Sequence, residues 1–173
     1  MMKGSKKMKY SIVYSSQTGN TKLLADHIYE QLQKEDCVYQ GTANEEALKA
    51  DRIYIGFWTD KGKCDPKTEE FLQTLTNQEV FLFGTAGFGE SAAYFEQIIK
   101  RTEAAIPEGV KVVGNYMCQG KMPASVRERY VKMSAAPEMK EKMENLIRNF
   151  DAALSHPDAQ DLEKLKEAVE SSR

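Results

Sequence analysis

Residues 16–21 form a short uncharged segment, Ser-Gln-Thr-Gly-Asn-Thr, that is rich in hydroxyl and amide groups. It follows a β-rich run at residues 9–14 and precedes a helical pattern in which Leu24, Ile28 and Leu32 lie four residues apart. The segment is therefore expected to be a strand-to-helix turn. Free backbone N–H groups and the positive end of the helix dipole favour an anion there, and a neutral loop can hold a phosphate by hydrogen bonds alone. The alternative is a capped helix start without a ligand.

A second segment, residues 58–65, could supply a flat apolar surface. Trp58 is the only tryptophan of the chain and comes just after a predicted strand at residues 51–57. A large aromatic face in that place can stack on a planar ligand and exclude water from one side. The alternative is that Trp58 packs as an anchor for its own loop. Residues 60–62 are expected to form a turn in which Gly62 adopts a positive φ.

Two further segments follow predicted strands. The run of residues 85–89, Thr-Ala-Gly-Phe-Gly, has glycines that would let the backbone approach a ring edge closely. In residues 118–123, Cys118 stands at a strand end, but no His or Asp partner can be placed beside it, which argues against a catalytic nucleophile. Gln119 and Gly120 could line the rim of a site.

A basic run lies just beyond the last of these segments. It could dock an acidic partner or attract a charged substrate, and the simpler alternative is a solvated helix face. Its members are Lys121, Arg127, Arg129 and Lys132.

Two nucleotide motifs are absent. Gly56 and Gly62-Lys63 resemble a P-loop, but five residues separate the glycines and Cys64 replaces the Ser or Thr. The glycines of residues 84–89 lack the GxGxxG spacing and do not follow the first strand. Nucleoside triphosphates and dinucleotides are therefore disfavoured as ligands, which leaves a monophosphate carried by a flat ring.

The elements that must position these segments alternate strand with helix five times. This pattern predicts an α/β domain with a parallel sheet covered on both faces, whose strand-to-helix loops meet at one edge. Asp65-Pro66 and Ser91 are expected to start helices, and residues 125–128 have the spacing of a capping box. Pro137 opens a pattern with a Met-rich apolar stripe that we expect to pack on the sheet; a docking groove is the alternative. The stripe comprises Met139, Met143, Leu146, Ile147, Phe150 and Leu154.

Residues 16–21 resemble the phosphate-binding signature of the flavodoxin family, in the position after the first strand that this family requires. The resemblance covers roughly residues 9–170 and implies a flavodoxin-like five-stranded parallel sheet, in strand order 2-1-3-4-5, that binds flavin mononucleotide (FMN). It implies phosphate binding by the side chains of Ser16, Thr18, Asn20 and Thr21 and by the backbone of Gln17 and Gly19.

The same resemblance places the flavin ring against Trp58 and the 85–89 loop. Phe88 resembles a position where many flavodoxins have a Tyr on the other ring face, and a peptide within residues 59–62 would bond flavin N5. Acidic groups near the ring, at Asp60, Asp65 and Glu90, would disfavour an anionic reduced flavin. The implied ring-binding residues are Trp58, Thr59, Asp60, Lys61, Gly62, Thr85, Ala86, Gly87, Phe88 and Gly89.

A narrower resemblance links three stretches, residues 56–62, 83–89 and 117–122, to the flavodoxin-like BilS proteins. That group is associated with a bilirubin reductase, so the implied function is an electron carrier to a partner reductase. Two alternatives remain open. The chain could itself be a flavin-dependent reductase of a small substrate, with Gln119 and Lys121 directing it, or it could be an accessory subunit that binds no flavin.

Composition limits the partners and the compartment. The chain has 173 residues, enough for one domain. Its net charge of −2 is too small to indicate electrostatic binding to nucleic acid or to a membrane surface. Electron-transfer flavodoxins are usually far more acidic, so the usual partner surface is in question. Three cysteines without a CxxC pattern suggest reduced thiols in the cytoplasm, and two histidines indicate no metal site. Residues 1–8 are expected to be a disordered basic tail before a single domain at 9–173.

Overall fold

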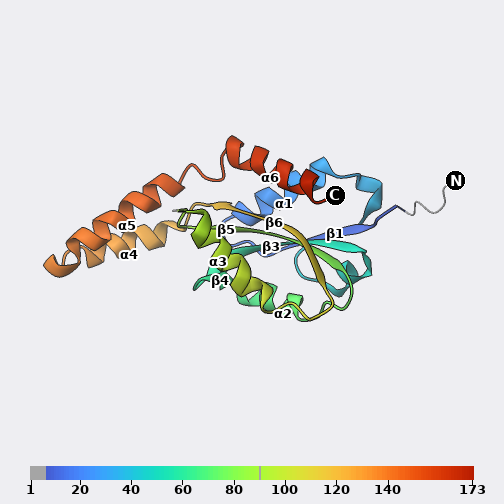
Figure 1. Cartoon of the computed structure of the whole chain (residues 1–173). Helices are drawn as coiled ribbons and strands as arrows, with labels where there is room; N and C mark the ends of the chain where they lie inside the picture. Colours follow the sequence, from blue (N-terminus) through green and yellow to red (C-terminus); the bar gives the residue numbers. More distant parts are fainter. Residues whose placement is uncertain (1–6, 90) are drawn as a thin grey trace.

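The computed structural model of the protein describes residues 7–89 and 91–173, and it is built around a parallel β-sheet (Figure 1). The strands run in the order β2-β1-β3-β5-β6, and a short strand, β4, pairs antiparallel with the end of β3. Without β4, this is the predicted order 2-1-3-4-5. The strands are β1 (Tyr10–Tyr14), β2 (Cys37–Gly41), β3 (Arg52–Asp60), β4 (Lys63–Cys64), β5 (Glu79–Ala86) and β6 (Lys111–Gln119).

Helices cover both faces of the sheet, as predicted. On one face lie α1 (Asn20–Gln31) and α6 (Ala159–Ser171), which pack against each other. On the other lie α2 (Pro66–Leu72), α3 (Ala92–Glu103) and a 3₁₀ segment at Glu45–Lys49; a second 3₁₀ segment, Lys34–Asp36, follows α1.

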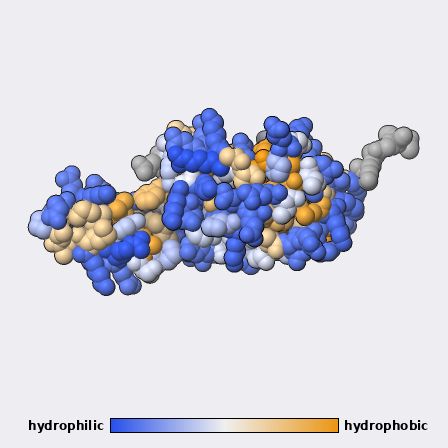
Figure 2. Space-filling model, turned by 90° about the horizontal axis from the view of Figure 1, so that it is seen from below, coloured by the Kyte–Doolittle hydropathy of each residue, from blue (hydrophilic) through white to orange (hydrophobic). Residues whose placement is uncertain are grey.

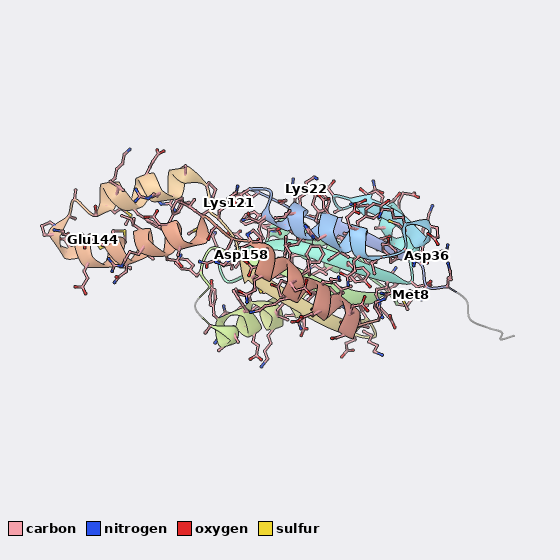
Figure 3. All side chains as sticks on the ribbon, turned by 90° about the horizontal axis from the view of Figure 1, so that it is seen from above. Met8, Lys22, Asp36, Lys121, Glu144 and Asp158 are labelled. Carbon is pink, nitrogen blue, oxygen red and sulfur yellow. The ribbon has the colours of Figure 1, made fainter. Side chains whose placement is uncertain are left out.

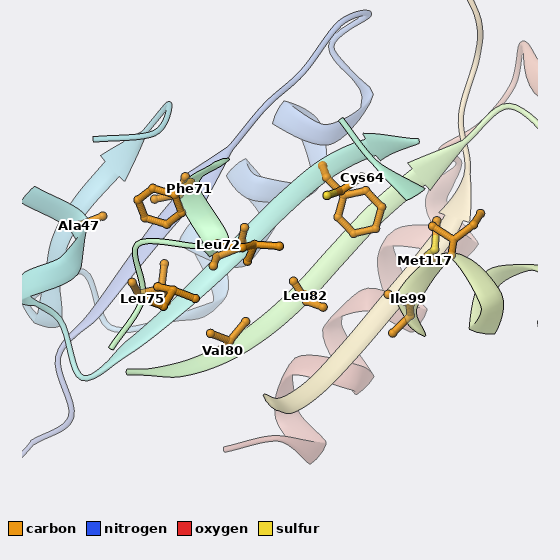
Figure 4. Packing of buried hydrophobic residues seen from close by; sticks show 14 of the residues in the cluster. Ala47, Cys64, Phe71, Leu72, Leu75, Val80, Leu82, Ile99 and Met117 are labelled. Atoms are coloured by element: carbon orange, nitrogen blue, oxygen red, sulfur yellow. The ribbon is translucent and has the colours of Figure 1, made fainter. Parts of the chain in front are cut away.

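Two hydrophobic clusters fill the space between sheet and helices, because side chains alternate along each strand. In β5, Val80 and Leu82 belong to the cluster under α2 and α3, and Phe81 and Phe83 to the cluster under α1 and α6. Figure 4 shows the first cluster, in which Leu72 of α2 lies over the sheet near Leu82. The central strands β3 and β5 are thus buried on both faces, which explains their nearly continuous apolar sequences, whereas the edge strands β2 and β6 are more exposed.

The predicted helix starts at Asp65 and Ser91 are confirmed. The Asp65 side chain accepts a hydrogen bond from the Thr68 N–H (3.2 Å), and Pro66 occupies the first helical position. Ser91 Oγ accepts from the Tyr94 N–H (3.2 Å) and caps α3. These caps fix where the chain turns from the sheet edge into each helix.

Strand β3 is longer than predicted. It continues through Trp58, Thr59 and Asp60, where the sequence suggested a loop, and turns back into β4 through Lys61 and Gly62. Both turn residues have positive φ (54° and 86°), as a two-residue type I′ hairpin requires. The positive φ expected at Gly62 is confirmed, but the turn belongs to a hairpin.

A helical hairpin leaves the body after β6 and forms a projecting arm (Figure 1). It consists of α4 (Ala124–Met133), a 3₁₀ turn (Pro137–Met139) and α5 (Lys140–Ala153). We call residues 122–155 the excursion. Figure 2 shows it as a narrow lobe whose surface mixes hydrophilic with moderately hydrophobic residues.

The excursion corrects two predictions. The Met-rich stripe does not pack on the sheet: α5 packs chiefly against α4, and the buried Met143 and Phe150 lie outside both sheet clusters. The expected capping box fails because α4 begins at Ala124, which places Ser125 inside the helix. A narrow apolar stripe can serve a two-helix hairpin as well as a sheet, and the sequence alone did not distinguish them.

Ionic and backbone contacts close the excursion. Arg127 of α4 donates two hydrogen bonds to Asp151 of α5 (2.8 and 3.1 Å), and this guanidinium holds the pKa of the Asp151 carboxyl below its usual value. At the base, the Lys121 N–H donates to the His156 carbonyl (3.1 Å). The chain therefore leaves and re-enters the body at one point. It continues into α6 through a capping box of Asp158 and Asp161.

Within the described ranges, no helix combines the length and apolar character needed to cross a membrane. The tail expected at residues 1–8 lies outside the described part of the chain except for Lys7 and Met8.

Candidate functional site

A cleft opens at the carboxyl edge of the sheet, where the loops after β1, β3, β5 and β6 meet. Most of the predicted ligand-binding residues line it. Its walls are Gln17, Thr18, Asn20, Thr21, Trp58, Thr59, Thr85, Ala86, Gly87, Gly120, Lys121, Met122 and Pro123. The predicted residues that do not line the cleft are Ser16, Gly19, Asp60, Lys61, Gly62, Phe88 and Gly89.

The turn from β1 into α1 offers unpaired backbone donors. Within the described residues, no protein group accepts a hydrogen bond from the N–H groups of Gln17, Thr18 or Asn20. Gly19 bends the chain with φ of 90° directly before α1. Donors of this kind at a helix N-terminus form an anion site, so this loop is chemically suited to a phosphate.

Ser16 completes the donor set. Its Oγ accepts from the N–H groups of Gly19 (3.1 Å) and Lys22 (3.3 Å). A hydroxyl that accepts two hydrogen bonds still has its own proton to donate. Ser16 therefore stabilises the loop and keeps one donor for an anion, although it lies outside the cleft walls.

Other side chains of the loop are engaged with neighbouring segments. Thr21, only 1% exposed, donates through Oγ1 to the Phe57 carbonyl (3.1 Å). Asn20 Nδ2 and Thr18 Oγ1 both donate to the Lys121 carbonyl, at 2.8 and 3.3 Å. The hydroxyl that the resemblance assigns to phosphate at Thr21 is therefore bound to the main chain of β3.

Trp58 forms the aromatic wall of the cleft and is half-buried. The buried Asp65 holds its backbone: Asp65 Oδ1 accepts from the Trp58 N–H (3.3 Å), and the Asp65 N–H donates to the Trp58 carbonyl (3.0 Å). Thr59 Oγ1 donates to the Thr85 carbonyl (2.8 Å), which ties the end of β3 to β5. Asp65 is thus a structural cap, and Glu90, the third expected acidic neighbour, lies outside the described residues.

The turn at Lys61-Gly62 faces away from the cleft walls and toward α3. Arg101 Nη1 donates to the Gly62 carbonyl (3.3 Å), and the Cys64 N–H donates to Thr102 Oγ1 (3.1 Å). The hairpin is therefore fixed at one end by α3, with the non-glycine residue Lys61 held at a positive φ.

The loop after β6 contributes more than the sequence suggested. Gly120 lines the cleft as expected, whereas Gln119, also expected at the rim, does not. Lys121 lines it too, in agreement with its expected place at the site, and the positions of Met122 and Pro123 were not predicted. The strand pattern correctly predicted that this loop lies at the carboxyl edge of the sheet. It did not predict that the loop extends to the β1–α1 turn. Figure 3 shows Lys121 where the excursion joins the body, on the same side as Lys22.

Cysteine chemistry does not contribute a nucleophile here. Cys118 is buried, and its burial raises the pKa of the thiol far above neutrality. Burial also raises the pKa of the Cys64 thiol to about 11. Neither thiol ionises appreciably at neutral pH, so neither has the thiolate that nucleophilic catalysis needs.

The size of the cleft limits how a ligand sits. Its volume is about 60 Å³, so it has room for a small anionic group and not for a whole fused ring system. A fused ring system would extend from this space along the mouth, against Trp58. The donor chemistry fits FMN at its phosphate, and the half-exposed aromatic wall fits its ring.

Comparisons with known proteins agree with this arrangement. A family model described as "Flavodoxin domain" matches residues 11–170. The chain is 38% identical to the flavodoxin-like domain-containing protein BilS of Clostridium symbiosum (strain WAL-14163), covering 95% of this chain and 96% of that protein. It is 33% identical to BilS of Clostridioides difficile (strain CD3), with 90% of each covered.

Among solved structures, a short-chain flavodoxin associated with a non-canonical PDU bacterial microcompartment superimposes with a TM-score of 0.60. The match covers 96% of this chain and 97% of that one at 15% identity, which supports the fold.

Proposed function

The chain belongs to the flavodoxin domain family, and from this premise we propose that it binds FMN and carries electrons to a partner reductase. The observation that carries the proposal is the juxtaposition of unpaired donors at the β1–α1 turn with the Trp58 wall of the same cleft. A phosphate and a flat ring are the two ends of FMN, and this cleft offers one suitable surface to each.

In this proposal the β1–α1 turn holds the phosphate. The N–H groups of Gln17, Thr18 and Asn20 donate to its oxygens, together with the Ser16 hydroxyl. Phosphate carries negative charge, so the dipole of α1 adds to the attraction without any charged side chain. The Thr21 side chain acts indirectly, because its bond to Phe57 fixes the start of α1 against β3.

The ring is held by Trp58 and by the backbone of residues 85–89. Bound flavin supplies the electron-transfer chemistry, and the protein supplies binding, orientation and electrostatics. Trp58 excludes water from one ring face, and its backbone is fixed by Asp65. A peptide within residues 59–62 remains our candidate for the bond to flavin N5, and Thr59 is the residue of this range that lines the cleft.

The partner is proposed from resemblance and charge. The likeness to the BilS group makes a bilirubin reductase the first acceptor to test. The small net charge of −2 suits a docking surface that is not dominated by acidic residues. All three cysteines are free thiols, which supports a reducing compartment such as the cytoplasm.

The test begins with an absorption spectrum of the protein as purified and after mixing with FMN. We expect a yellow protein that keeps FMN through gel filtration and accepts electrons one at a time in a reductive titration. Riboflavin, which has the same ring but lacks the phosphate, is the control ligand and should bind far more weakly than FMN. Failure to retain FMN would reject the carrier and favour the accessory-subunit alternative.

A turnover assay without a partner protein distinguishes the direct-reductase alternative from the electron carrier. A protein of that kind would oxidise a nicotinamide donor and reduce a small acceptor without a partner. The structure weakens one of its premises, because the Gln119 amide donates to Gly87 (2.9 Å) and Asn149 (3.2 Å) and so is not available to direct a substrate. Lys121 is exposed at the cleft and is the remaining candidate for that role.

A further inference from the structure

The excursion and the segment that leads into it make direct hydrogen bonds to the loops that would hold the cofactor. Just before the excursion, the Lys121 carbonyl accepts from Asn20 Nδ2 (2.8 Å) and Thr18 Oγ1 (3.3 Å) of the phosphate loop. The Gly120 N–H donates to the Ala86 carbonyl (2.9 Å) at the end of β5. The loop after β6 thus contacts the phosphate loop (residues 16–21) on one side and the ring loop (residues 85–89) on the other.

A second contact comes from α5, near the base of the arm. Asn149 of α5 reaches the ring loop, 62 residues earlier in the chain, and donates from Nδ2 to the Gly87 carbonyl (3.0 Å). Gln119 Nε2 donates to the same carbonyl (2.9 Å) and to Asn149 Oδ1 (3.2 Å). The two side-chain amides and the Gly87 carbonyl form a closed triangle of hydrogen bonds, in which both amides donate to the same carbonyl.

Close packing reinforces this triangle. A Cβ atom on Gly87 would lie 2.5 Å from Met122 Sδ, and one on Gly89 would lie 2.9 Å from the Gln119 side chain. Neither glycine has a positive φ, so what a larger residue would meet here is the close approach of the Met122 and Gln119 side chains. The glycines expected to face a ring edge therefore make room for the loop that leads into the excursion.

Fixing the Gly87 carbonyl has a defined effect on the ring loop. The peptide bond is planar and trans, so a held carbonyl also sets the direction of the Phe88 N–H on the opposite side. Glycine-rich segments lose much conformational entropy on ordering, and contacts formed before binding reduce that cost for a ligand. Amide donors at Gly87 thus preorganise the loop.

We propose that Asn149, acting with Gln119, is a positioning residue of the cofactor site, which makes the α4–α5 hairpin part of that site. Asn149 holds the Gly87 peptide so that residues 85–89 present their backbone to the flavin ring. The inference rests on the proposed FMN binding. A purely structural role would be limited to fastening the arm to the body.

The experiment compares Asn149→Ala with Asn145→Ala, using FMN as the probe. Asn145 lies one helical turn earlier on α5, is exposed, and hydrogen-bonds only Arg148 of its own helix in the described structure, so it is a matched control. Emission from Trp58, the only tryptophan, reports binding at the cleft. We expect FMN affinity to fall about three- to tenfold for Asn149→Ala, as for a lost neutral hydrogen bond, and to stay unchanged for Asn145→Ala.

Two further variants separate positioning from fastening. Gln119→Ala should weaken FMN binding similarly, and the double variant should lose less than the product of the two single losses, because both donors share one carbonyl. Asn149→Asp keeps the side-chain shape but places a negative oxygen against the Gly87 carbonyl. It should make the reduction potential of bound FMN more negative, which loosening of the arm alone would not do.

The outcomes are distinct. If the unmodified protein binds no FMN, the proposed function fails and this inference fails with it. If it binds FMN, and Asn149→Ala binds FMN as tightly as Asn145→Ala and the unmodified protein do, only the positioning role is overturned. An unchanged potential in Asn149→Asp likewise reduces Asn149 to a structural fastener.

Discussion

At the scale of single residues, Trp58 is the most informative side chain. It is the only tryptophan and lines the cleft, so FMN bound there should quench its fluorescence. Replacing Trp58 by Ala should weaken FMN binding about tenfold, because a large stacking surface is lost. Isothermal titration, which does not depend on tryptophan emission, measures the change.

Trp58→Phe is the control for this prediction. It keeps a flat aromatic face and should restore most of the FMN affinity. If Trp58 only packs its own loop, Trp58→Ala should lower the stability of the protein and leave its FMN affinity unchanged, and that result would contradict stacking.

The residue-level predictions from sequence were limited by partners far away in the chain. The donor types of residues 16–21 predicted a phosphate loop, and the unpaired backbone N–H groups of Gln17, Thr18 and Asn20 have the chemistry that such a loop needs. The sequence did not indicate that Thr21 would bond Phe57, or that Thr18 and Asn20 would bond Lys121 about a hundred residues later. Such pairings depend on loop packing, which periodicity does not encode.

At the scale of elements, Asp65 joins a helix cap to the Trp58 strand end. Asp65→Ala should lower the free energy of unfolding by about 2–4 kcal/mol, because it removes the cap of α2 and leaves buried donors at Thr68 and Trp58 unpaired. Urea denaturation measures this loss. Asp65→Asn retains one acceptor and should be clearly less damaging; equal losses would show that the cap contributes little.

The arm should behave as a separate packing unit. Phe150 of α5 is buried but lies outside both sheet clusters, and α5 packs chiefly against α4. Phe150→Ala should therefore accelerate amide hydrogen exchange in α4 and α5 by roughly a hundredfold, as expected for a large-to-small change of about 3 kcal/mol confined to one local unit.

The same experiment should leave exchange in β3 and β5 nearly unchanged. Phe81→Ala, in the cluster under α1 and α6, is the comparison and should accelerate exchange in the strands themselves. Equal acceleration in arm and strands after Phe150→Ala would mean that the arm and body unfold as one unit.

Strands and caps were predictable because each depends on local sequence. The helix starts predicted at Asp65-Pro66 and Ser91 were both correct. The end of β3 was misplaced because its last residues pair with β4, a partner two residues long. The stripe of α5 was assigned to the sheet because its apolar spacing carries no information about what it packs against.

At the scale of the whole molecule, the excursion should be removable. Its two ends meet at the Lys121–His156 hydrogen bond, so a short Gly-Ser linker can replace residues 122–155 with little loop strain. We expect the α/β body to keep its fold by circular dichroism and to lose FMN affinity, because Asn149 and Met122 are removed. A body that unfolds without the arm would contradict the description of the arm as peripheral.

The overall charge gives a further expectation. With a net charge of −2, electron transfer to a partner should depend only weakly on ionic strength, in contrast to steering by a strong acidic field. Stopped-flow rates with the partner reductase at 0.05 and 0.5 M salt provide the measurement. A steep fall with salt would indicate a local charged patch, and substitution of Arg129 and Lys132 in the basic run would then locate it.

The arm also has a mechanical consequence. At 1.5 Å per residue, the 14 residues of α5 extend about 21 Å from the point where the chain re-enters the body, and Asn149 lies only about 6 Å from that pivot. If the hairpin turned as a rigid body about that point, a force on its tip would be multiplied about 3.5-fold at Asn149, and a tip movement would be reduced there by the same factor. In that case the hairpin would act as a lever, and a partner bound at its tip would strain the Gly87 peptide without contacting the cleft.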